Sequence, residues 1–334
     1  MQFREDLMNG LVQRFSRQSS AIVFCIVPVA LLLVAVVQKY PPIRPADANS
    51  PTLIWDIDLK LANALPRSFR TTDGPVNAKA DEIRVISGLP DLHASGSGEF
   101  TPEGLKLVLT LTHGAVTVFD LRQETHVFVN DLPVSWYASR DWVNVGRSQR
   151  AIEQDELAWV QSLKPGSEMI VRPGEPVKKG SVDSATPQRV IVANASTERD
   201  VVRAAGANYV RLTLTDHVRP LDDEVDRFIV AVRALPENAW AHFHCEAGLG
   251  RTTTFMVLYD MLRNANRVSL EDIVQRQKLV GCGYDVLRPP ELENWKALYM
   301  VDRAAFVRAF YCYAGANPNG RPQLWSEWLK TGTQ

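Results

Sequence analysis

The stretch His244-Cys245-Glu246-Ala247-Gly248-Leu249-Gly250-Arg251-Thr252-Thr253 decides how the rest of the chain is interpreted. The apolar run Ala239 to Phe243 precedes it and a helical pattern begins near Thr252, so the stretch is predicted to be a loop between a strand and a helix. Glycines at positions 248 and 250 allow successive backbone N–H groups to converge on one anion, and the helix adds its positive end. The sequence therefore predicts a phosphate-binding loop.

A cysteine and an arginine frame this loop. The field that holds a phosphate also stabilises a thiolate, so Cys245 is predicted to be a nucleophile at neutral pH. The planar fork of Arg251 suits two oxygens of a transferring phosphoryl group, and Thr252 can offer a hydroxyl to the departing sulfur. The alternative is a buried structural cysteine with a chance arginine. The paired glycines, the preceding His244 and the strand-loop-helix context disfavour it.

The loop resembles the cysteine phosphatase signature. More narrowly, it resembles the protein-tyrosine-phosphatase-like inositol polyphosphatases (phytases), whose loop has the sequence His-Cys-Glu-Ala-Gly-x-Gly-Arg-Thr-Thr. The resemblance covers roughly residues 60 to 330. It implies an α/β fold of the protein-tyrosine-phosphatase type, in which helices flank a central, mostly parallel sheet and a small β-rich partial barrel is inserted.

An uncharged apolar run, Ala21 to Val37, follows a segment that contains basic residues. Its length is at the lower limit for a spanning helix, so a signal anchor and a cleavable signal peptide both stay open for residues 21–38. Residues 1–20 are then expected in the cytoplasm, and the catalytic body is expected outside it, periplasmic or secreted, and membrane-bound if the segment stays uncleaved. Residues 39–52 contain four prolines and are predicted to be a linker.

The phosphatase domain is predicted to span residues 53–334. Within it, Val116 to Leu121 is predicted to be a buried strand and Ser95-Gly96-Ser97-Gly98 a loop. Frequent turn signals predict a small β-rich insertion at about residues 130–195, after the pattern of the resembling family. Lys178 and Lys179 inside it are expected at a charged turn tip, with positive charge at the cleft rim as the alternative.

Phosphoryl transfer to a cysteine needs an acid that protonates the leaving oxygen. Asp216 follows the strand Asn208 to Leu214, and its loop resembles the general-acid loop of the family. A simple turn residue is the alternative for Asp216. His217 is a candidate contact for a substrate phosphate, and a hydrogen-bonded loop histidine is the alternative.

Further substrate contacts rest on the resemblance. It places Arg67, Arg70 and Asp141 in or beside the substrate cleft, and Lys296 and Arg303 at peripheral phosphates. The loop residues expected to bind the scissile phosphate are Glu246, Ala247, Gly248, Leu249 and Gly250. On composition alone, the basic residues outside the loop would be ordinary solvated charges, and Asp141 a turn residue.

Composition excludes several other classes of protein. A net charge of −1 gives no global attraction to nucleic acid. Nucleotide-binding glycine loops are missing and the six histidines lack metal-ligand spacing, so we expect no cofactor and no metal. Four cysteines do not make a disulfide framework, and Cys282 and Cys312 stay open between free thiols and a pair. The oligomeric state also stays open.

The sequence thus predicts a phosphoric monoester hydrolase that removes phosphates from myo-inositol polyphosphates (phytate) through a phosphocysteine intermediate. A protein-tyrosine or dual-specificity phosphatase is the first alternative. The basic residues named above disfavour it, because a densely anionic small molecule needs a cationic rim, whereas phosphotyrosine needs a deep slot and an aromatic clamp. The second alternative is a pseudophosphatase that binds phosphate without turnover, and the intact cysteine, arginine and aspartate argue against it.

Overall fold

The computed structural model describes residues 52–74, 85–179, 185–291 and 293–332. The predicted membrane segment and nearly all of the predicted linker lie outside these residues. Within the described ranges, none of the helices combines the length and the apolar character needed to cross a membrane.

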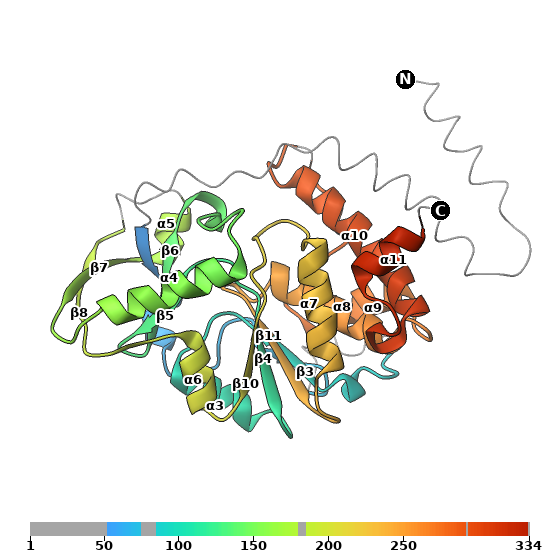
Figure 1. Ribbon diagram of the computed structural model, residues 1–334, viewed down its shortest axis with the longest axis horizontal. Helices are drawn as coiled ribbons and strands as arrows, with labels where there is room; N and C mark the ends of the chain where they lie inside the picture. Colours follow the sequence, from blue (N-terminus) through green and yellow to red (C-terminus); the bar gives the residue numbers. More distant parts are fainter. Residues whose placement is uncertain (1–51, 75–84, 180–184, 292, 333–334) are drawn as a thin grey trace, which may run out of the picture.

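A five-stranded sheet in the order β10-β4-β11-β3-β2 carries the loop at Cys245 (Figure 1). Its strands are β2 (Arg70–Thr71), β3 (Ala94–Ser97), β4 (Val116–Asp120), β10 (Asn208–Arg211) and β11 (Trp240–His244). β10, β4, β11 and β3 are parallel, and only β2 pairs antiparallel, with β3. The predicted mostly parallel central sheet is therefore confirmed, and β11 leads directly from its centre into the loop.

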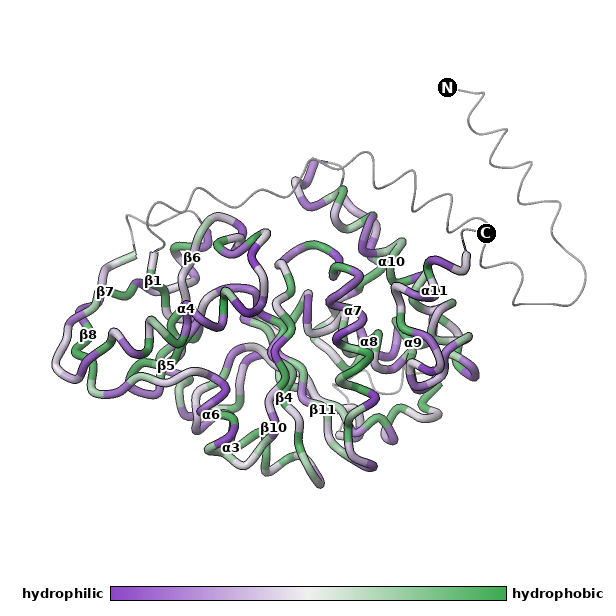
Figure 2. The backbone as a smooth tube through the Cα atoms, in the orientation of Figure 1, coloured by the Kyte–Doolittle hydropathy of each residue, from purple (hydrophilic) through white to green (hydrophobic). Residues whose placement is uncertain are grey.

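Helices cover both faces of this sheet. The described residues form the helices α3 (Pro102–Thr110), α4 (Gln149–Ser162), α5 (Gly174–Lys178), α6 (Glu198–Ala204), α7 (Asp222–Arg233), α8 (Gly250–Asn264), α9 (Leu270–Val280), α10 (Ala297–Ala316) and α11 (Trp325–Thr331), with short 3-10 turns at Leu59–Leu61, Pro90–Leu92, Ser139–Asp141 and Pro318–Gly320. Of these helices, α4 and α5 contact strands outside this sheet. Phe119, Ala241 and Phe243 pack with α7, α8 and α10, whereas Val118 and Trp240 pack with α3 and α6. This alternation follows the two-residue period of a strand. Figure 2 shows the hydrophobic residues along β4 and α8.

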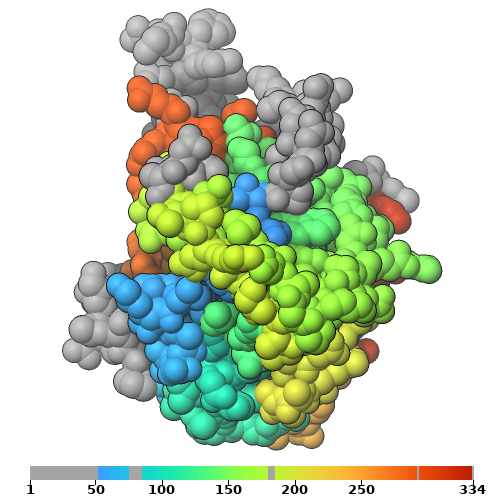
Figure 3. Space-filling view, turned by 90° about the vertical axis from the view of Figure 1, so that its left-hand side faces the viewer, coloured from blue at the N-terminus to red at the C-terminus, as the bar shows by residue number. Residues whose placement is uncertain are grey.

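A second sheet of six strands has the order β8-β7-β1-β6-β5-β9. Its strands are β1 (Thr52–Trp55), β5 (His126–Val129), β6 (Leu132–Tyr137), β7 (Glu168–Pro173), β8 (Gln188–Ile191) and β9 (Ala195–Ser196). The first strand comes from the start of the described chain, with Thr52 opposite Tyr137 on β6. In Figure 3 the darkest blue residues, from the start of the described chain, lie between green and yellow-green residues from later in the sequence. The β-rich unit thus uses a segment outside the predicted insertion, because this strand pairing is long-range.

The segment Ser95-Gly96-Ser97-Gly98 is not the loop that its composition predicts, because its first three residues belong to β3 and are buried. A Cβ atom on Gly96 would lie 2.6 Å from Sδ of Met256 and 2.8 Å from Cγ2 of Thr252. Small residues are needed here because β3 lies close against α8, and not because the chain must bend.

Candidate active site

The loop after β11 holds the predicted nucleophile at the N-terminus of α8. Cys245 is only 3% exposed, and the hydroxyl of Thr252 donates to its Sγ over 3.1 Å. Gly248 has a φ of +74°, and a Cβ there would lie 2.4 Å from the backbone nitrogen of Gly98. Only glycine fits this position without strain, so the loop packs its backbone directly against the end of β3.

Arg251 is held by a carboxylate that sequence analysis did not assign to the site. Its Nη1 and Nη2 lie 2.6 and 2.7 Å from the two carboxylate oxygens of Glu124, and both side chains are buried. Burial alone would raise the pKa of Glu124, but Arg251 holds that pKa well below its usual range. Glu124 comes just after β4, the parallel neighbour of β11, so both side chains reach the same edge of the sheet. No local pattern in the sequence marks Glu124, because its contact depends on which strands become neighbours.

The predicted general acid, Asp216, lies beside the arginine. Its Oδ1 is 3.1 Å from Nε of Arg251, and its Oδ2 is 3.2 Å from Nε2 of His217. The indole of Trp142 donates to the backbone oxygen of Asp216 over 3.0 Å, which fixes the loop from the side of the second sheet. Asp216, His217 and Arg251 line one small hollow together with Leu214, Val218, Pro220, Gly250, Thr254, Phe255, Tyr284 and Arg303. The structure therefore brings the acid and the phosphate-binding loop together.

His217 adopts the left-handed backbone region, with a φ of +70°. Burial, assisted by Lys296 and Arg251, lowers its pKa to about 4 although Asp216 opposes the shift. The ring is therefore neutral at pH 7, and it can act as a hydrogen-bonding group but not as a cation.

A line of charges joins the loop to the second sheet through Glu246. Nζ of Lys178 lies 3.0 Å from Glu246 and 2.9 Å from Asp141, and Arg67 also pairs with the Glu246 carboxylate. Burial opposes ionisation of Glu246, but Lys178 and Arg67 lower its pKa to about 2. Burial raises the pKa of Asp141 to about 7 despite its contact with Lys178. The prediction of a charged turn tip is wrong for Lys178, because this residue ends α5 and its ammonium group lies between two carboxylates.

Arg70 points into the protein. Its guanidinium donates to the backbone oxygen of Gly248 over 2.8 Å and to Oγ1 of Thr253 over 3.0 Å, and the side chain is buried. Burial lowers its pKa to about 10, which leaves it charged at pH 7. Arg70 therefore supports the loop from inside by binding Gly248 and Thr253. Arg67 differs, because its side chain is exposed at the rim.

The two basic residues of the C-terminal region differ in position. Arg303, on α10, is buried with its guanidinium 5.5 Å from the ring centroid of Tyr284, and its Nε lacks a hydrogen-bond partner among the described residues. Lys296 lies just before α10, with its ammonium 5.3 Å from the ring centroid of Trp295. Arg303 therefore faces the hollow beside Asp216, whereas Lys296 lies at the outer rim.

One further cation at the rim was not predicted. The guanidinium of Arg140 lies 4.3 Å from the ring centroid of Trp295 and 5.1 Å from that of Trp142. The contact joins the second sheet to the segment before α10, two regions whose proximity no local pattern reveals. Among the described residues, Cys245, Cys282 and Cys312 form no disulfide bond.

Known proteins resemble this chain over most of its length. The family model of PTP-like phytases, described by the words inositol hexakisphosphate, matches residues 119–263. A solved PTP-like phytase from Bdellovibrio bacteriovorus is 41% identical, with a TM-score of 0.71, and the match covers 87% of this chain and 98% of that one. The PTP-like myo-inositol phosphatase from Mitsuokella multacida, solved with myo-inositol-(1,3,4,5)-tetrakisphosphate, is 33% identical, with a TM-score of 0.76 over 87% of this chain and 49% of that one.

A curated relative is also similar. The effector protein hopD2 of Pseudomonas syringae pv. tomato is 34% identical over 263 residues, which are 78% of this chain and 56% of the effector. This chain thus spans about half the length of that relative.

Proposed function

This chain belongs to the protein-tyrosine-phosphatase-like phytase family, and on that premise we propose that it removes phosphate groups from myo-inositol polyphosphates through a phosphocysteine on Cys245. The observation that carries the proposal is the meeting of Cys245, Arg251 and Asp216 around one buried loop. A nucleophile, an oxygen-binding fork and an acid are the groups that this reaction needs.

In the first step, the thiolate of Cys245 attacks phosphorus while the bond to the leaving oxygen breaks. Protonated Asp216 gives its proton to that oxygen, so an alcohol leaves. Arg251 and the backbone N–H groups of the loop bind the three phosphoryl oxygens as charge redistributes over them. Glu124 holds the plane of the guanidinium, so the fork is in place before substrate arrives.

In the second step, water attacks the phosphocysteine and the sulfur–phosphorus bond breaks. The Asp216 carboxylate now accepts the proton of the water, as microscopic reversibility requires. The hydroxyl of Thr252, 3.1 Å from Sγ, donates to the leaving thiolate. Inorganic phosphate leaves, and both groups return to their starting protonation states.

The choice of an inositol polyphosphate is supported by the charges around the hollow. Arg303 lines the hollow beside Asp216. Arg67 pairs with Glu246 of the loop, and Lys296 and Arg140 both lie against the ring of Trp295. A substrate with several phosphates can use these cations together, whereas a phosphotyrosine has one phosphate to offer. A related phosphatase was solved with an inositol tetrakisphosphate, which agrees with this substrate class.

A side-by-side turnover measurement tests the proposal. We expect phosphate release from myo-inositol hexakisphosphate with a kcat/KM well above that for a phosphotyrosine peptide, and no turnover of either by C245S. Faster cleavage of the peptide would favour the protein phosphatase alternative. Binding of both compounds without any turnover by the unmodified protein would favour the pseudophosphatase.

We also propose that the catalytic body works outside the cytoplasm, either in the periplasm or secreted. The support is the uncharged run Ala21 to Val37 behind a basic segment. Fusion of residues 1–60 to alkaline phosphatase, which is active only after export, should give active reporter. Equal activity of a fusion that lacks the apolar run would contradict this placement.

A further inference from the structure

A second cavity, the distal cavity, lies at the other end of the central sheet from Cys245. Its volume is about 410 Å³, and its lining is mostly polar. His93 precedes β3 and Asn238 precedes β11, so the cavity lies where these parallel strands begin, whereas the catalytic loop follows the end of β11. α8 begins in that loop and ends at Asn264, which lines the cavity. Its 15 residues span about 22 Å, so the cavity is separate from the substrate cleft.

Four arginines line the distal cavity, and none of them pairs with a carboxylate in the part of the chain that the structure describes. They are Arg233 at the end of α7, Arg263 in the last turn of α8, Arg267 after α8 and Arg321 after the 3-10 turn Pro318–Gly320. Elsewhere at the surface, Arg147 and Arg288 each lie 2.7 Å from a carboxylate oxygen. The lining also contains two carboxylates, those of Asp91 and Glu237, so the cavity keeps an excess of two positive charges.

Neutral oxygen atoms hold two of these guanidinium groups in place. Nη1 of Arg263 donates to Oδ1 of Asn319 over 2.6 Å, and Nε and Nη2 of Arg267 donate to Oδ1 of Asn264 over 3.0 and 2.6 Å. Asn264 is buried, and its amide nitrogen donates to the backbone oxygen of Gly88 over 3.2 Å, which fixes the acceptor. An amide oxygen orients a guanidinium group but does not neutralise it. The positive charge therefore stays available to a ligand.

Stabilisation of helix ends explains only part of this cluster. The C-terminal end of a helix carries a partial negative charge, which favours a cation in the last turn. Arg233 lies in the last turn of α7 and also donates to the backbone oxygens of Gly320 and Gln323, so it has a structural role. Arg267 and Arg321 differ, since both follow the end of their element and both are exposed.

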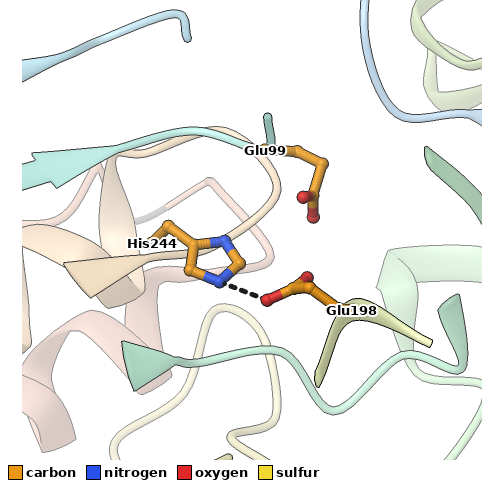
Figure 4. A group of neighbouring side chains, drawn as sticks. All are labelled: Glu99, Glu198 and His244. Carbon is orange, nitrogen blue, oxygen red and sulfur yellow. Dashed lines mark ion pairs between the residues drawn. The ribbon is translucent and has the colours of Figure 1, made fainter. Parts of the chain in front are cut away.

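The buried cluster behind the catalytic loop has matched charges, unlike the distal cavity. Figure 4 shows Glu99, Glu198 and His244, with a dashed line for the ion pair of His244 and Glu198. Burial alone would lower the pKa of His244, but Glu198 and Glu99 raise it to about 9. Glu99 also pairs with Arg122. The charges of this cluster are therefore compensated inside the protein, whereas the arginines of the distal cavity have no such partners among the described residues.

We propose that the distal cavity is a second anion-binding site, which takes a small molecule with two or more phosphate groups. A guanidinium group binds a phosphate through two parallel hydrogen bonds, and a phosphate offers three oxygens to donors from different elements, whereas a carboxylate offers two. A cavity of this size fits a small molecule, and its polar lining disfavours an apolar one. The excess of two positive charges sets the minimum charge of the ligand. The inference does not rest on the phosphatase activity proposed above.

Phenylglyoxal, which reacts with accessible guanidinium groups, tests this site one arginine at a time. The modified peptides of the full chain are quantified by mass spectrometry, in the C245S variant so that the probes are not consumed. Pyrophosphate or myo-inositol hexakisphosphate at about ten times its dissociation constant should slow the modification of Arg267 and Arg321 about tenfold. Arg150 on α4 and Arg308 on α10, both exposed, should react at an unchanged rate.

Two double variants separate the site from a general attraction of anions. R267A/R321A should weaken pyrophosphate binding, measured through the protection of Arg263, by about tenfold or more, because hydrogen bonds between charged partners are lost. R150A/R308A removes the same charge from other surfaces and should leave that binding unchanged. R321A alone carries the test if the double variant is unstable, since the Arg321 side chain forms no hydrogen bond with the described residues.

Three results would overturn the inference. One is an unchanged rate at Arg267 and Arg321; if Arg67, beside the catalytic loop, is protected in the same sample, the proposed function stays intact. Another is equal protection of Arg150 and Arg308, which would show unspecific attraction. The third is protection by citrate and by neither phosphate compound, which would change the class of ligand. Protection of Arg267 and Arg321 in a protein that hydrolyses no phosphomonoester would keep this inference and contradict the proposed function.

Discussion

Replacing Glu124 with glutamine should separate the assembly of the site from the stability of the fold. The glutamine has nearly the same shape, but it offers one acceptor and one donor where Arg251 presents two donors. One of the two short contacts, at 2.6 and 2.7 Å, is therefore lost, and an N–H group of the amide faces an N–H group of the guanidinium. The fork loses the partner that sets its plane.

The expected magnitude follows from the burial of the pair. A hydrogen bond to a charged group contributes about 1.5–3 kcal/mol, and a loss of that size in the transition state lowers kcat/KM about 10-fold to 100-fold. Removing one partner of a buried ion pair costs about 3–5 kcal/mol of stability, and the retained contact should keep the loss toward the lower end. Both kcat/KM for p-nitrophenyl phosphate and the denaturant midpoint should fall in E124Q.

The chain supplies a matched control in Glu156. Its carboxylate binds Arg211 in the same two-pronged manner, with distances of 3.2 and 3.0 Å, and both side chains are buried. Arg211 also donates to the backbone oxygen of Glu124 over 3.1 Å, so this pair supports the same segment without contacting Arg251. E156Q should lose comparable stability and keep kcat/KM under conditions where the protein stays folded. If E124Q and E156Q lost activity equally, or E124Q lost none, Glu124 would have no specific role in orienting Arg251.

Three further outcomes are expected. G96A should lower the unfolding free energy by about 1–3 kcal/mol, because its methyl group would overlap Met256, while G315A on α10, where nothing lies within 4 Å, should not destabilise in the same thermal melt. R70K should lower kcat/KM by a similar factor for the hexakisphosphate and for p-nitrophenyl phosphate, since Arg70 binds the loop; a loss confined to the hexakisphosphate would make it a substrate ligand. The pKa of His217 is about 4 in the folded chain and about 6.5 in the unfolded chain, so the unfolded chain takes up this proton first as the pH falls. The unfolding free energy should therefore rise between about pH 4 and pH 6.5, by up to about 3 kcal/mol. H217N should flatten that rise in thermal melts across this range.

The loop between β11 and α8, and the position of Asp216 beside it, could be predicted because short stretches of sequence carry their patterns. Glycines that bind an anion, a cysteine and an arginine at fixed spacing, and an aspartate after a strand each leave a local pattern. Glu124 leaves none, since its contact with Arg251 depends on which strand lies beside it in space. The same limit applies to Arg70, because no local rule states whether an arginine near a cleft points outward to a phosphate or inward to Gly248.

The composition of a segment can also suggest the wrong structure when packing, and not flexibility, selects its residues. Gly96 and its serine neighbours resemble a flexible loop, yet they belong to β3, where a larger side chain at Gly96 would collide with α8. Lys178 resembles a solvated turn charge, yet it is enclosed between Glu246 and Asp141. In both cases the deciding contact comes from a segment far away in the sequence.

The strand order explains how groups distant in sequence meet at one edge of the sheet. β10, β4 and β11 are parallel neighbours, so the segments after them all leave at the same edge, and these segments contain Asp216, Glu124 and Cys245 in turn. β2 runs antiparallel to β3, so it is the beginning of β2, with Arg67 just before it, that lies at this edge. The arginine that supports the loop begins the strand, as Arg70 opposite Gly96. The directions of four strands thus bring Asp216, Glu124, Cys245 and Arg67 to one edge of the sheet. If any one of these strands ran the other way, its residue would leave the site.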